Sequence, residues 1–333
     1  MYKINQTTKR ELAKVQKNIT KELASEKIVQ DIYEYIFQSE GKKTRALVSL
    51  LSSKTSKIAR ASNSIIKPVN NKQRIQLASI IELLHTATLV HDDVIDESSL
   101  RRGEKSVNQV WTNSYSVLMG DFIYSKAFIL MMTLDHPLIL KELAAATNDI
   151  ARGEIIQLNL FENSLSLELN DLLKVSYLKT GRLFEASAKT GAMLANFSPA
   201  DVKNFGLMGK NLGIAFQIQD DILDYESLKT DTGKPSLQDF QEGKITFPLF
   251  YALQNCRKID KNFLLKHLGS KTLTMSAKSK VCDLVRETAT VKSADALLKK
   301  YLSQASKNLE KLNHHSCYDE MLNLIMFSSQ RRS

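Results

Sequence analysis

Residues 84–96 read LHTATLVHDDVID, and three aspartates, Asp92, Asp93 and Asp96, end this otherwise apolar stretch. Apolar residues at helical spacing precede it, so the pattern predicts one long helix over 72–96. Residues four apart on a helix share one face, so Asp92 and Asp96 present a pair of carboxylates on the same side. This pair is a candidate cation site at the end of a helix.

The same pattern recurs at residues 213–225, which read GIAFQIQDDILDY and end a second predicted helix over 201–225. Its aspartates are Asp220, Asp221 and Asp224. Carboxylates at the C-terminal end of a helix oppose the helix dipole, which costs stability unless a cation compensates. Two such sets facing each other would hold several Mg2+ ions and leave room for a diphosphate.

Basic segments accompany both aspartate motifs. Arginine presents a fork of donors that suits phosphate oxygens, and a loop that enters a helix is a natural anion site. The segments are 41–45 (GKKTR), 101–103 (RRG), 179–182 (KTGR), 232–235 (TGKP) and 242–244 (EGK). Together with the two aspartate sets, they indicate diphosphate chemistry.

The composition favours an all-α fold. Glycine and proline are scarce, at 12 and 5 of 333 residues, and no stretch shows the sustained alternation of apolar and polar residues that marks a half-buried strand. No low-complexity linker interrupts the chain, so we predict one domain over residues 1–333. Within it we expect an N-terminal helical segment (1–35), a motif-bearing catalytic core (36–250) and C-terminal helices (251–333).

The formal charge of +10 invites comparison with nucleic-acid-binding proteins. The basic residues are scattered, however, and a nucleic-acid-binding module would leave the aspartate motifs unexplained, so we expect no nucleic-acid partner. The N-terminus lacks the apolar core of a secretory signal, and we find no apolar run of membrane-spanning length. We therefore expect a cytoplasmic protein, or one in the stroma of a plastid that encodes its own copy.

Three long motifs carry a resemblance to a known family. They are residues 84–103, residues 119–124 (MGDFIY) and residues 213–225. In these motifs the chain resembles the trans-prenyl diphosphate synthases of the polyprenyl synthetase family, over about residues 40–250. The resemblance implies an isoprenoid-synthase-type helical bundle around a central cavity, a homodimer, and Mg2+ as cofactor, with three ions per active site once substrate is bound. The implied substrates are isopentenyl diphosphate and an allylic diphosphate.

The resemblance also implies roles for individual residues. The metal ligands would be Asp92, Asp93, Asp96, Asp220, Asp221 and Asp224. The allylic diphosphate would be bound by Arg101, Lys179, Thr180, Gln217, Lys234 and Lys244, and isopentenyl diphosphate by Lys42, Arg45, His85 and Arg102. The catalytic residues would be Asp92, Asp96, Arg101, Lys179, Asp220 and Lys234.

One segment departs from the family pattern. The family's Gly-Gly-Lys-Arg-x-Arg-Pro reads Glu40-Gly41-Lys42-Lys43-Thr44-Arg45-Ala46 in this chain. Lys42 and Arg45 keep the ligand positions, whereas the first glycine, the intervening arginine and the proline are replaced. The departure puts the shape of this loop in doubt, rather than its role.

Product length is expected to depend on side chains about one helical turn before Asp92. Ala87 and Thr88 are small, whereas short-chain members of the family carry bulky aromatic residues in this region. Leu84 lies one turn further down. We therefore expect a long product, of the octaprenyl or solanesyl type used for quinone side chains, and transient membrane contact for its release, which co-sedimentation with anionic vesicles would test.

Two alternatives stay open on the sequence. One is a synthase of geranylgeranyl or farnesyl length. The other is a non-catalytic subunit of a heteromeric prenyl synthase, although such a subunit would be expected to lose motif aspartates or arginines, which this chain keeps. A class I terpene cyclase is disfavoured because cyclases usually carry an Asn/Ser/Glu pattern in place of the second aspartate motif.

Overall fold

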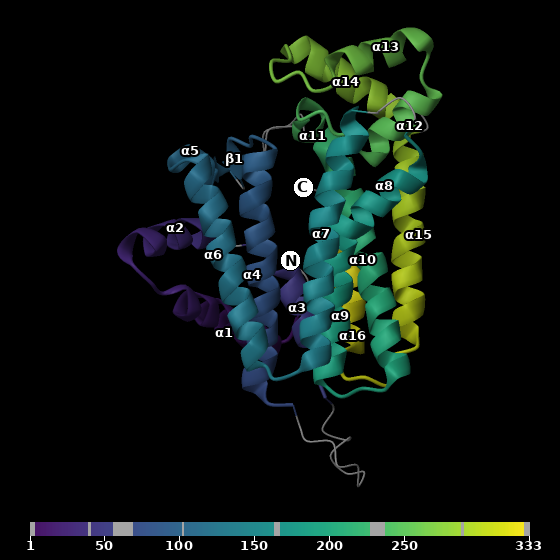
Figure 1. The fold of residues 1–333 in the computed structure, drawn as a ribbon. Coiled ribbons are helices and arrows are strands. Elements are labelled where there is room, and N and C mark those ends of the chain that lie inside the picture. Colours follow the sequence, from purple (N-terminus) through teal and green to yellow (C-terminus); the bar gives the residue numbers. More distant parts are fainter. Residues whose placement is uncertain are drawn as a thin grey trace. The chain divides into compact units, whose positions relative to one another are not determined.

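The computed structural model describes residues 4–38, 41–55, 69–101, 103–162, 167–226, 237–287 and 290–329. Regular structure in these ranges is almost entirely helical (Figure 1), which confirms the predicted all-α class. The helices are α1 Gln6–Leu23, α2 Lys27–Gln38, α3 Thr44–Ser52, α4 Asn71–Ile95, α5 Val107–Val110, α6 Asn113–Thr133, α7 Pro137–Glu162, α8 Leu169–Ser176, α9 Arg182–Leu194, α10 Pro199–Glu226, α11 Gln238–Gln241, α12 Phe247–Asn255, α13 Lys258–His267, α14 Met275–Glu287, α15 Thr290–Glu310 and α16 Tyr318–Ser329.

The two helices predicted to carry the aspartate motifs are present as α4 and α10, and each motif lies at the C-terminal end of its helix. Helix α4 begins where the side chain of Asn70 accepts a hydrogen bond from the backbone N–H of Lys72, a standard N-cap. The predicted first helix is also present as α1. Its buried face runs through Glu11, Val15 and Ile19, whereas Leu12 is half-exposed.

Contacts divide the chain into two compact units. Unit 1 comprises Met1–Thr147, Leu183–Gly209 and Ser306–Leu324, and unit 2 comprises Asn148–Arg182, Lys210–Ala305 and Ile325–Ser333. The predictions of a single domain and of a central cavity stay predictions.

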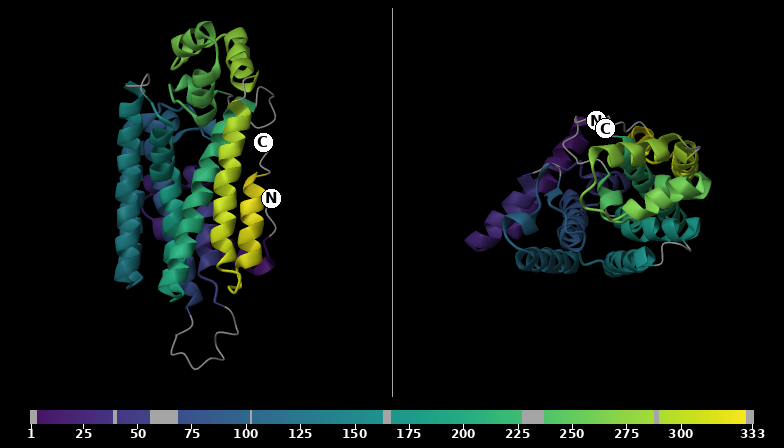
Figure 2. Two further views of the ribbon diagram at one scale, coloured as in Figure 1. Left: turned by 90° about the vertical axis from the view of Figure 1, so that its right-hand side faces the viewer. Right: turned by 90° about the horizontal axis from the view of Figure 1, so that it is seen from above.

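Helix α4 lies at the centre of unit 1. Helices α1, α3 and α6 all pack against it, and Figures 1 and 2 show α4 and α6 running side by side. Nearly every residue from Leu77 to Leu84 is buried as a result, on all sides of the helix. A helix that is apolar all round is expected to lie in a core, which is where this one is found. The core therefore fixes the direction in which the end of α4 points.

Buried ion pairs connect segments of unit 1 that are far apart in sequence. Arg74 at the start of α4 lies 2.7 Å from Glu11 of α1, and both side chains are largely buried. Lys54, which follows α3, lies 2.5 Å from Glu320 of α16. Glu320 also accepts a hydrogen bond from the hydroxyl of Thr8, so the N-terminal helix and the last helix are joined through one carboxylate.

Unit 2 has its own apolar core, formed by the end of α10 and helices α11 to α14. Tyr225, Phe240, Leu249 and Val281 are buried members of this core. The hydroxyl of Thr246 donates a hydrogen bond to the hydroxyl of Tyr225 at 3.1 Å, so the buried phenol has a polar partner. The end of α10, which carries the second aspartate motif, is thereby packed against the segment that follows it.

The structure differs from the sequence prediction in three local features. A two-stranded antiparallel ribbon, β1 Leu100–Arg101 and β2 Glu104–Lys105, follows the first motif. A five-residue π-helical segment, η3 Tyr177–Gly181, separates α8 from α9. Helix α6 is long and apolar enough to cross a membrane by length and composition, although we predicted no such run; 39% of its apolar window is buried in the protein, and such helices also occur in the cores of soluble proteins.

Candidate active site

The first aspartate motif divides into residues with different environments. Asp93 is buried, with 1% of its surface exposed, whereas Asp92 and Asp96 are half-buried. The backbone N–H of Asp96, the C-cap of α4, donates to the carbonyl of Asp92, so the helix continues through the motif to its last residue. The geometry therefore leaves Asp92 and Asp96 more accessible to a cation than Asp93.

Asp93 is held by Arg101. The Nε of Arg101 donates to both carboxylate oxygens of Asp93 at 2.7 Å, and its Nη2 lies 2.6 Å from Oδ1. Burial lowers the pKa of the Arg101 guanidinium, but the hydrogen bond and the charges of Asp93, Asp92 and Asp96 outweigh it and raise the pKa overall. Arg101 lies on β1, and the ribbon turns at Gly103, whose φ of 85° suits glycine. The ribbon therefore holds a permanent positive charge beside the motif.

His91, the residue before the motif, is a point at which α4 contacts α6 closely. A side chain at Gly120 would place its Cβ 2.1 Å from the Nε2 of His91, so only glycine permits this approach. The same Nε2 lies 3.1 Å from the carbonyl oxygen of Val117, and the ring lies near Tyr124. This contact explains the glycine of the 119–124 motif and fixes the rotation of α4 just before its carboxylates.

A second group of cations in unit 1 surrounds His85. The guanidinium of Arg45 lies 2.8 Å from the Nε2 of His85 and 4.8 Å from the ring centroid of Phe184. Lys42 is exposed in the loop before α3, and Lys43, at the N-cap of that helix, adopts a left-handed φ of 45°. Arg45 thus lies beside His85, and the assignment of both residues to one diphosphate stays a prediction.

Two of these residues, Lys43 and His85, line a pocket within unit 1. Lys43, His85, Asp93, Arg101 and Lys105 are among the residues that line it. The pocket therefore combines positive groups with three carboxylates, Glu82, Asp93 and Glu104, and its lysines and arginine are the groups that could contact an anion such as a diphosphate.

The three residues predicted to control product length do not share one environment. Leu84 and Ala87 are buried, with 1% and 0% of their surface exposed, whereas Thr88 is half-exposed. Leu84, Thr88 and Asp92 follow one another at intervals of four residues and so lie on one face of α4, whereas Ala87 shares a face with His91. Thr88 is therefore the member of the set best placed to meet a ligand near Asp92.

In unit 2, Lys179 and Thr180 lie in the π-helical segment η3. Single π-helical turns are uncommon and occur frequently at functional sites. The ammonium of Lys179 lies 2.6 Å from the carboxylate of Glu154 and also donates to the side-chain oxygen of Gln157, so α7 holds it in place. A side chain at Gly153 would approach Leu178 and Lys179, which shows how closely α7 and η3 pack.

A chain of hydrogen bonds runs from η3 to the second motif. The hydroxyl of Thr180 donates to Oε1 of Gln217 at 2.7 Å, and Nε2 of Gln217 donates to Oδ1 of Asp221 at 2.8 Å. Oδ2 of Asp221 accepts from the backbone N–H of Phe247 at 3.2 Å. Three residues predicted from the resemblance are thus brought together, and both oxygens of Asp221 have protein partners.

The second motif contains a concentration of negative charge. Asp224 accepts hydrogen bonds from the backbone N–H groups of Gln238 and Asp239, at 3.0 and 3.2 Å. Burial and the nearby charge of Asp239 raise the pKa of Asp221 to about 8, and the same two causes raise the pKa of Asp224 well above its ordinary value. Asp220, by contrast, is exposed. A bound cation would relieve this crowding of carboxylates.

The remaining predicted phosphate ligands are only partly described. The ammonium of Lys244 lies 2.7 Å from Glu242 and 3.9 Å from Asp239, so it is held at the edge of the same acidic group. Arg102 and Lys234 lie outside the described residues.

The donor chemistry of both motifs suits Mg2+. Each motif offers carboxylate oxygens, and hard divalent cations prefer oxygen ligands. In each motif the second aspartate, Asp93 or Asp221, is buried and hydrogen-bonded within the protein, whereas the first, Asp92 or Asp220, is more exposed. The first aspartates are therefore the ones we expect to contact a metal ion directly.

Sequence reasoning missed the residues that position the predicted ones. Glu154 and Gln157 hold Lys179, Asp239 adds a carboxylate to the second motif, and Phe184 packs against Arg45. Glu154 and Gln157 are three residues apart on one helix face, a spacing that marks them as a pair in hindsight. The other two come from distant segments, and no local signal identifies them.

Known proteins are similar to this chain over most of its length. A family model described as polyprenyl synthetase matches residues 26–285. The octaprenyl diphosphate synthase of Escherichia coli (strain K12) is 37% identical over 254 residues, which is 76% of this chain and 75% of that protein. Solanesyl diphosphate synthase 2, chloroplastic, of Arabidopsis thaliana is 33% identical over 300 residues, covering 90% of this chain and 69% of that protein.

Among solved structures, a polyprenyl synthase from Caulobacter crescentus CB15, complexed with calcium and isoprenyl diphosphate, is similar over most of its length. Its TM-score is 0.88 at 30% sequence identity, and the match covers 98% of this chain and 97% of that chain. A decaprenyl diphosphate synthase from Rhodobacter capsulatus has a TM-score of 0.85 at 28% identity, with 98% of both chains covered.

The unequal roles of neighbouring aspartates lead to a stability prediction for the protein in metal-free buffer. Asp93→Asn breaks the pair with Arg101 and should lower the free energy of unfolding by about 2 kcal/mol, a value reduced for the partial exposure of the arginine. Asp92→Asn removes a negative charge that opposes the helix dipole but also loses the attraction of Arg101, so it should change the free energy of unfolding by less than about 0.5 kcal/mol. Urea denaturation of both variants measures the difference, and equal losses would show that the two aspartates are not divided in this way.

Proposed function

The chain belongs to the polyprenyl synthetase family of prenyltransferases, and on that premise we propose that it is a Mg2+-dependent trans-prenyl diphosphate synthase. It would join isopentenyl diphosphate to an allylic diphosphate. The observation that carries the proposal is that each aspartate motif has residues of the predicted phosphate-binding set held beside it. Arg101 is fixed beside Asp92 and Asp96, and the Thr180–Gln217 chain reaches Asp221.

In the proposed reaction the bond between the allylic carbon and its diphosphate oxygen breaks, and the electron pair leaves with pyrophosphate. The alkene of isopentenyl diphosphate attacks the allylic cation to form the new carbon–carbon bond, and a proton is then lost, for which the released pyrophosphate is an available base. Mg2+ bound by the carboxylates would supply charge that neutralises the diphosphate.

The chain's own residues would act mainly by orientation and electrostatics. Arg101 is already fixed beside the first motif, and Lys179 is held by Glu154, so their charges need little rearrangement when pyrophosphate leaves. With Lys234, these are the cations to which we assign catalysis. Thr180, Gln217 and Lys244 would complete the binding of the allylic diphosphate.

We assign isopentenyl diphosphate to the pocket of unit 1. His85 lines this pocket, the guanidinium of Arg45 lies 2.8 Å from its Nε2, and Lys42 is in the loop before α3. The pocket is also lined by Lys43 and Arg101, and we assign Arg102 to the same substrate from the family pattern. This places a second diphosphate near the first aspartate motif, as a condensation of two diphosphates requires.

We propose a long-chain product of the octaprenyl or solanesyl type. The relatives named above carry those names, and the half-exposed residue one turn before Asp92 is Thr88, which is too small to block a growing chain. Leu84, buried one further turn down the same face, would be met only by a longer tail.

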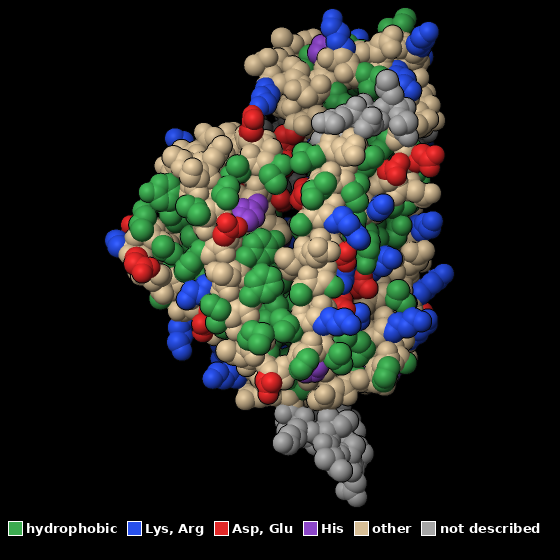
Figure 3. Space-filling model, in the orientation of Figure 1, with side chains coloured by type: hydrophobic (Ala, Val, Ile, Leu, Met, Phe, Trp, Pro, Cys, Tyr) green, Lys and Arg blue, Asp and Glu red, His purple; other side chains and the backbone are tan. Residues whose placement is uncertain are grey.

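We also propose that the enzyme is a homodimer that uses the outer face of α6. Figure 3 shows hydrophobic side chains gathered over this helix. Leu118, Ile129 and Met132 are 66%, 58% and 65% exposed, an unusual density of large apolar side chains for a free surface. Covering them with the same face of a second copy would remove them from water.

The proposed activity predicts the outcome of a product assay. Purified protein with Mg2+, labelled isopentenyl diphosphate and an allylic primer of geranyl, farnesyl or geranylgeranyl length should yield a ladder of all-trans products that ends at one long chain length. Products are dephosphorylated and sized by reversed-phase chromatography. Asp92→Ala and Asp220→Ala should each lower kcat about 100-fold or more.

The controls for this assay separate the open alternatives. Omission of Mg2+ should abolish turnover, and products that end at 15 or 20 carbons (about three or four isoprene units) would support a farnesyl or geranylgeranyl synthase. No elongation of any primer by a folded protein would contradict the proposal and favour a subunit that depends on a partner.

The position of Thr88 predicts how product length can be changed. Thr88→Phe places a bulky ring one turn before Asp92 and should shorten the final product while turnover of the first condensation falls less than about ten-fold. Thr88→Ser is the matched control and should leave the length distribution unchanged. An unchanged distribution in Thr88→Phe would show that the tail does not pass this face of α4.

The exposed face of α6 predicts a change in oligomeric state. Leu118→Glu combined with Met132→Glu introduces charges into the proposed contact and should convert a dimer into a monomer in size-exclusion chromatography with light scattering. Glu substitutions at the exposed Ile259 and Met275, which lie outside α6, are the control and should leave the dimer intact. A wild-type monomer, or a dimer that tolerates the α6 charges, would contradict the assignment.

A further inference from the structure

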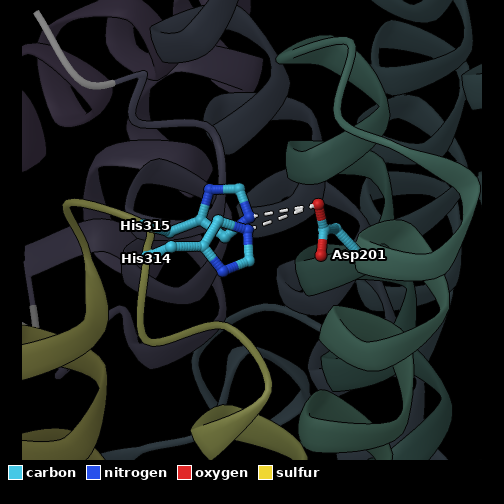
Figure 4. Close-up of side chains that lie close together, drawn as sticks. All are labelled: Asp201, His314 and His315. Carbon is cyan, nitrogen blue, oxygen red and sulfur yellow. Dashed lines mark ion pairs between the residues drawn. The ribbon is translucent and has the colours of Figure 1, made fainter. Parts of the chain in front are cut away.

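Two adjacent histidines converge on one carboxylate in unit 1, on residues to which the proposed catalysis assigns no role. His314 and His315 lie in the connection between α15 and α16, and Asp201 lies in the first turn of α10. The Nε2 atoms of His314 and His315 are 3.6 and 3.4 Å from the same Oδ2 of Asp201 (Figure 4). One ligand atom from each of the three residues lies within 4.8 Å of the other two.

The local sequence places Asp201 firmly. Helix α10 begins at Pro199, and the side chains of Ser198 and Asp201 bridge its first turn: the hydroxyl of Ser198 donates to Oδ2 of Asp201, and the backbone N–H of Asp201 donates to that hydroxyl. This arrangement explains an aspartate at residue 201. It does not explain why two imidazoles point at the same oxygen.

The ring of His315 is buried and held in one orientation. Its side chain is 10% exposed, and its ring centroid lies 4.1 Å from that of Phe197 and 5.4 Å from that of Phe205. Its Nε2 is buried and makes no hydrogen bond, although it points at Asp201. The side chain of His314, by contrast, is 56% exposed.

The distances fit metal ligation better than hydrogen bonding. An N–H···O hydrogen bond spans about 2.7–3.2 Å, shorter than either separation between imidazole and carboxylate. In a tetrahedral Zn2+ site with bonds of about 2.0–2.1 Å, neighbouring ligand atoms lie about 3.3 Å apart. The observed separations of 3.4 and 3.6 Å are close to this spacing.

We propose that Asp201, His314 and His315 form a binding site for a divalent transition-metal ion, with Zn2+ as the preferred ion. Two imidazole nitrogens and one carboxylate oxygen are a common ligand set for Zn2+, and water would complete the coordination. The site shares no residue with either aspartate motif, and Asp201 lies in the first turn of α10 whereas the second motif ends that helix.

The bound ion would join the connection between α15 and α16 to the start of α10. The connection is already anchored by Leu312 and Cys317, which are both fully buried. A metal that binds the folded protein and not the unfolded chain adds stability in proportion to its affinity and concentration. The role we assign to the site is therefore structural.

The test is a Zn2+ titration of the full chain after removal of metals, with a chromophoric chelator as competitor. Excess Mg2+ is present to occupy the carboxylates of the aspartate motifs, since Mg2+ competes poorly for imidazole. We expect one equivalent of Zn2+ to bind and to raise the unfolding temperature, and Co2+ to give the visible absorption of a tetrahedral complex.

Variants locate the site. His314→Ala removes a half-exposed ligand without disturbing the core, and Asp201→Asn keeps the shape of the capping side chain. Each should weaken Zn2+ binding by about 10- to 100-fold or more. The loss of a residue that only hydrogen-bonds to a ligand already costs that much, and these residues would be the ligands themselves. His267→Ala, which removes a histidine outside the cluster, is the matched control and should bind as the wild type does.

Two results would overturn the proposal. One is the absence of stoichiometric Zn2+ binding in excess Mg2+, which would leave the three residues as an ion-pair cluster only. The other is equal affinity in the wild type and in His314→Ala, which would place the ion elsewhere. Prenyl transfer with Mg2+ should be unchanged in both variants, so the outcome does not depend on the proposed activity.

Discussion

Negative charge concentrated at the C-terminal ends of two helices is the constraint on which the local structure around the site depends. At the end of α4 and of α10, carboxylates oppose the helix dipole and also repel one another. The negative charge is compensated by different groups at the two helix ends. Arg101 is brought back by a short ribbon to bind Asp93, whereas the backbone N–H groups of Gln238, Asp239 and Phe247 bind Asp224 and Asp221. The segments that follow the motifs therefore supply the groups that hydrogen-bond to these carboxylates.

The cations near the motifs, like the carboxylates, have partners within the protein. Lys179 is bound by Glu154, Lys244 by Glu242, and Arg45 lies against His85 and Phe184. A lysine that is already held loses less side-chain entropy when it binds a phosphate than one that moves freely in solvent. In the proposed function each of these cations would share its charge between its protein partner and the phosphate oxygens. The gain is orientation before the reaction, which is where electrostatic catalysis obtains its advantage.

The sequence predicted the helices and the chemical groups, but not the groups that position them. Helices α4 and α10 were predictable because apolar periodicity and the aspartate motifs are local signals. The π-helical turn at Lys179 was not, since it depends on the packing of η3 against α7 at Gly153. Asp239 and Phe184 join the site only through tertiary structure. The burial of His315 against Phe197 was likewise invisible, because a polar loop sequence resembles a surface loop whether or not an aromatic pair lies beneath it.

Helix α4 shows why distance in sequence from the motif is a poor guide to function. Ala87 and Thr88 are adjacent, and both seemed suited to line a product tunnel. Ala87 lies one turn before His91, whose ring is seated on Gly120, and Ala87 is fully buried. Thr88 lies one turn before Asp92 and is half-exposed. One face of the helix is therefore committed to packing against α6, and the neighbouring face remains available for ligand. A bulky residue at 87 would therefore strain the contact between α4 and α6, whereas the same residue at 88 would lie on the face to which we assign the growing chain.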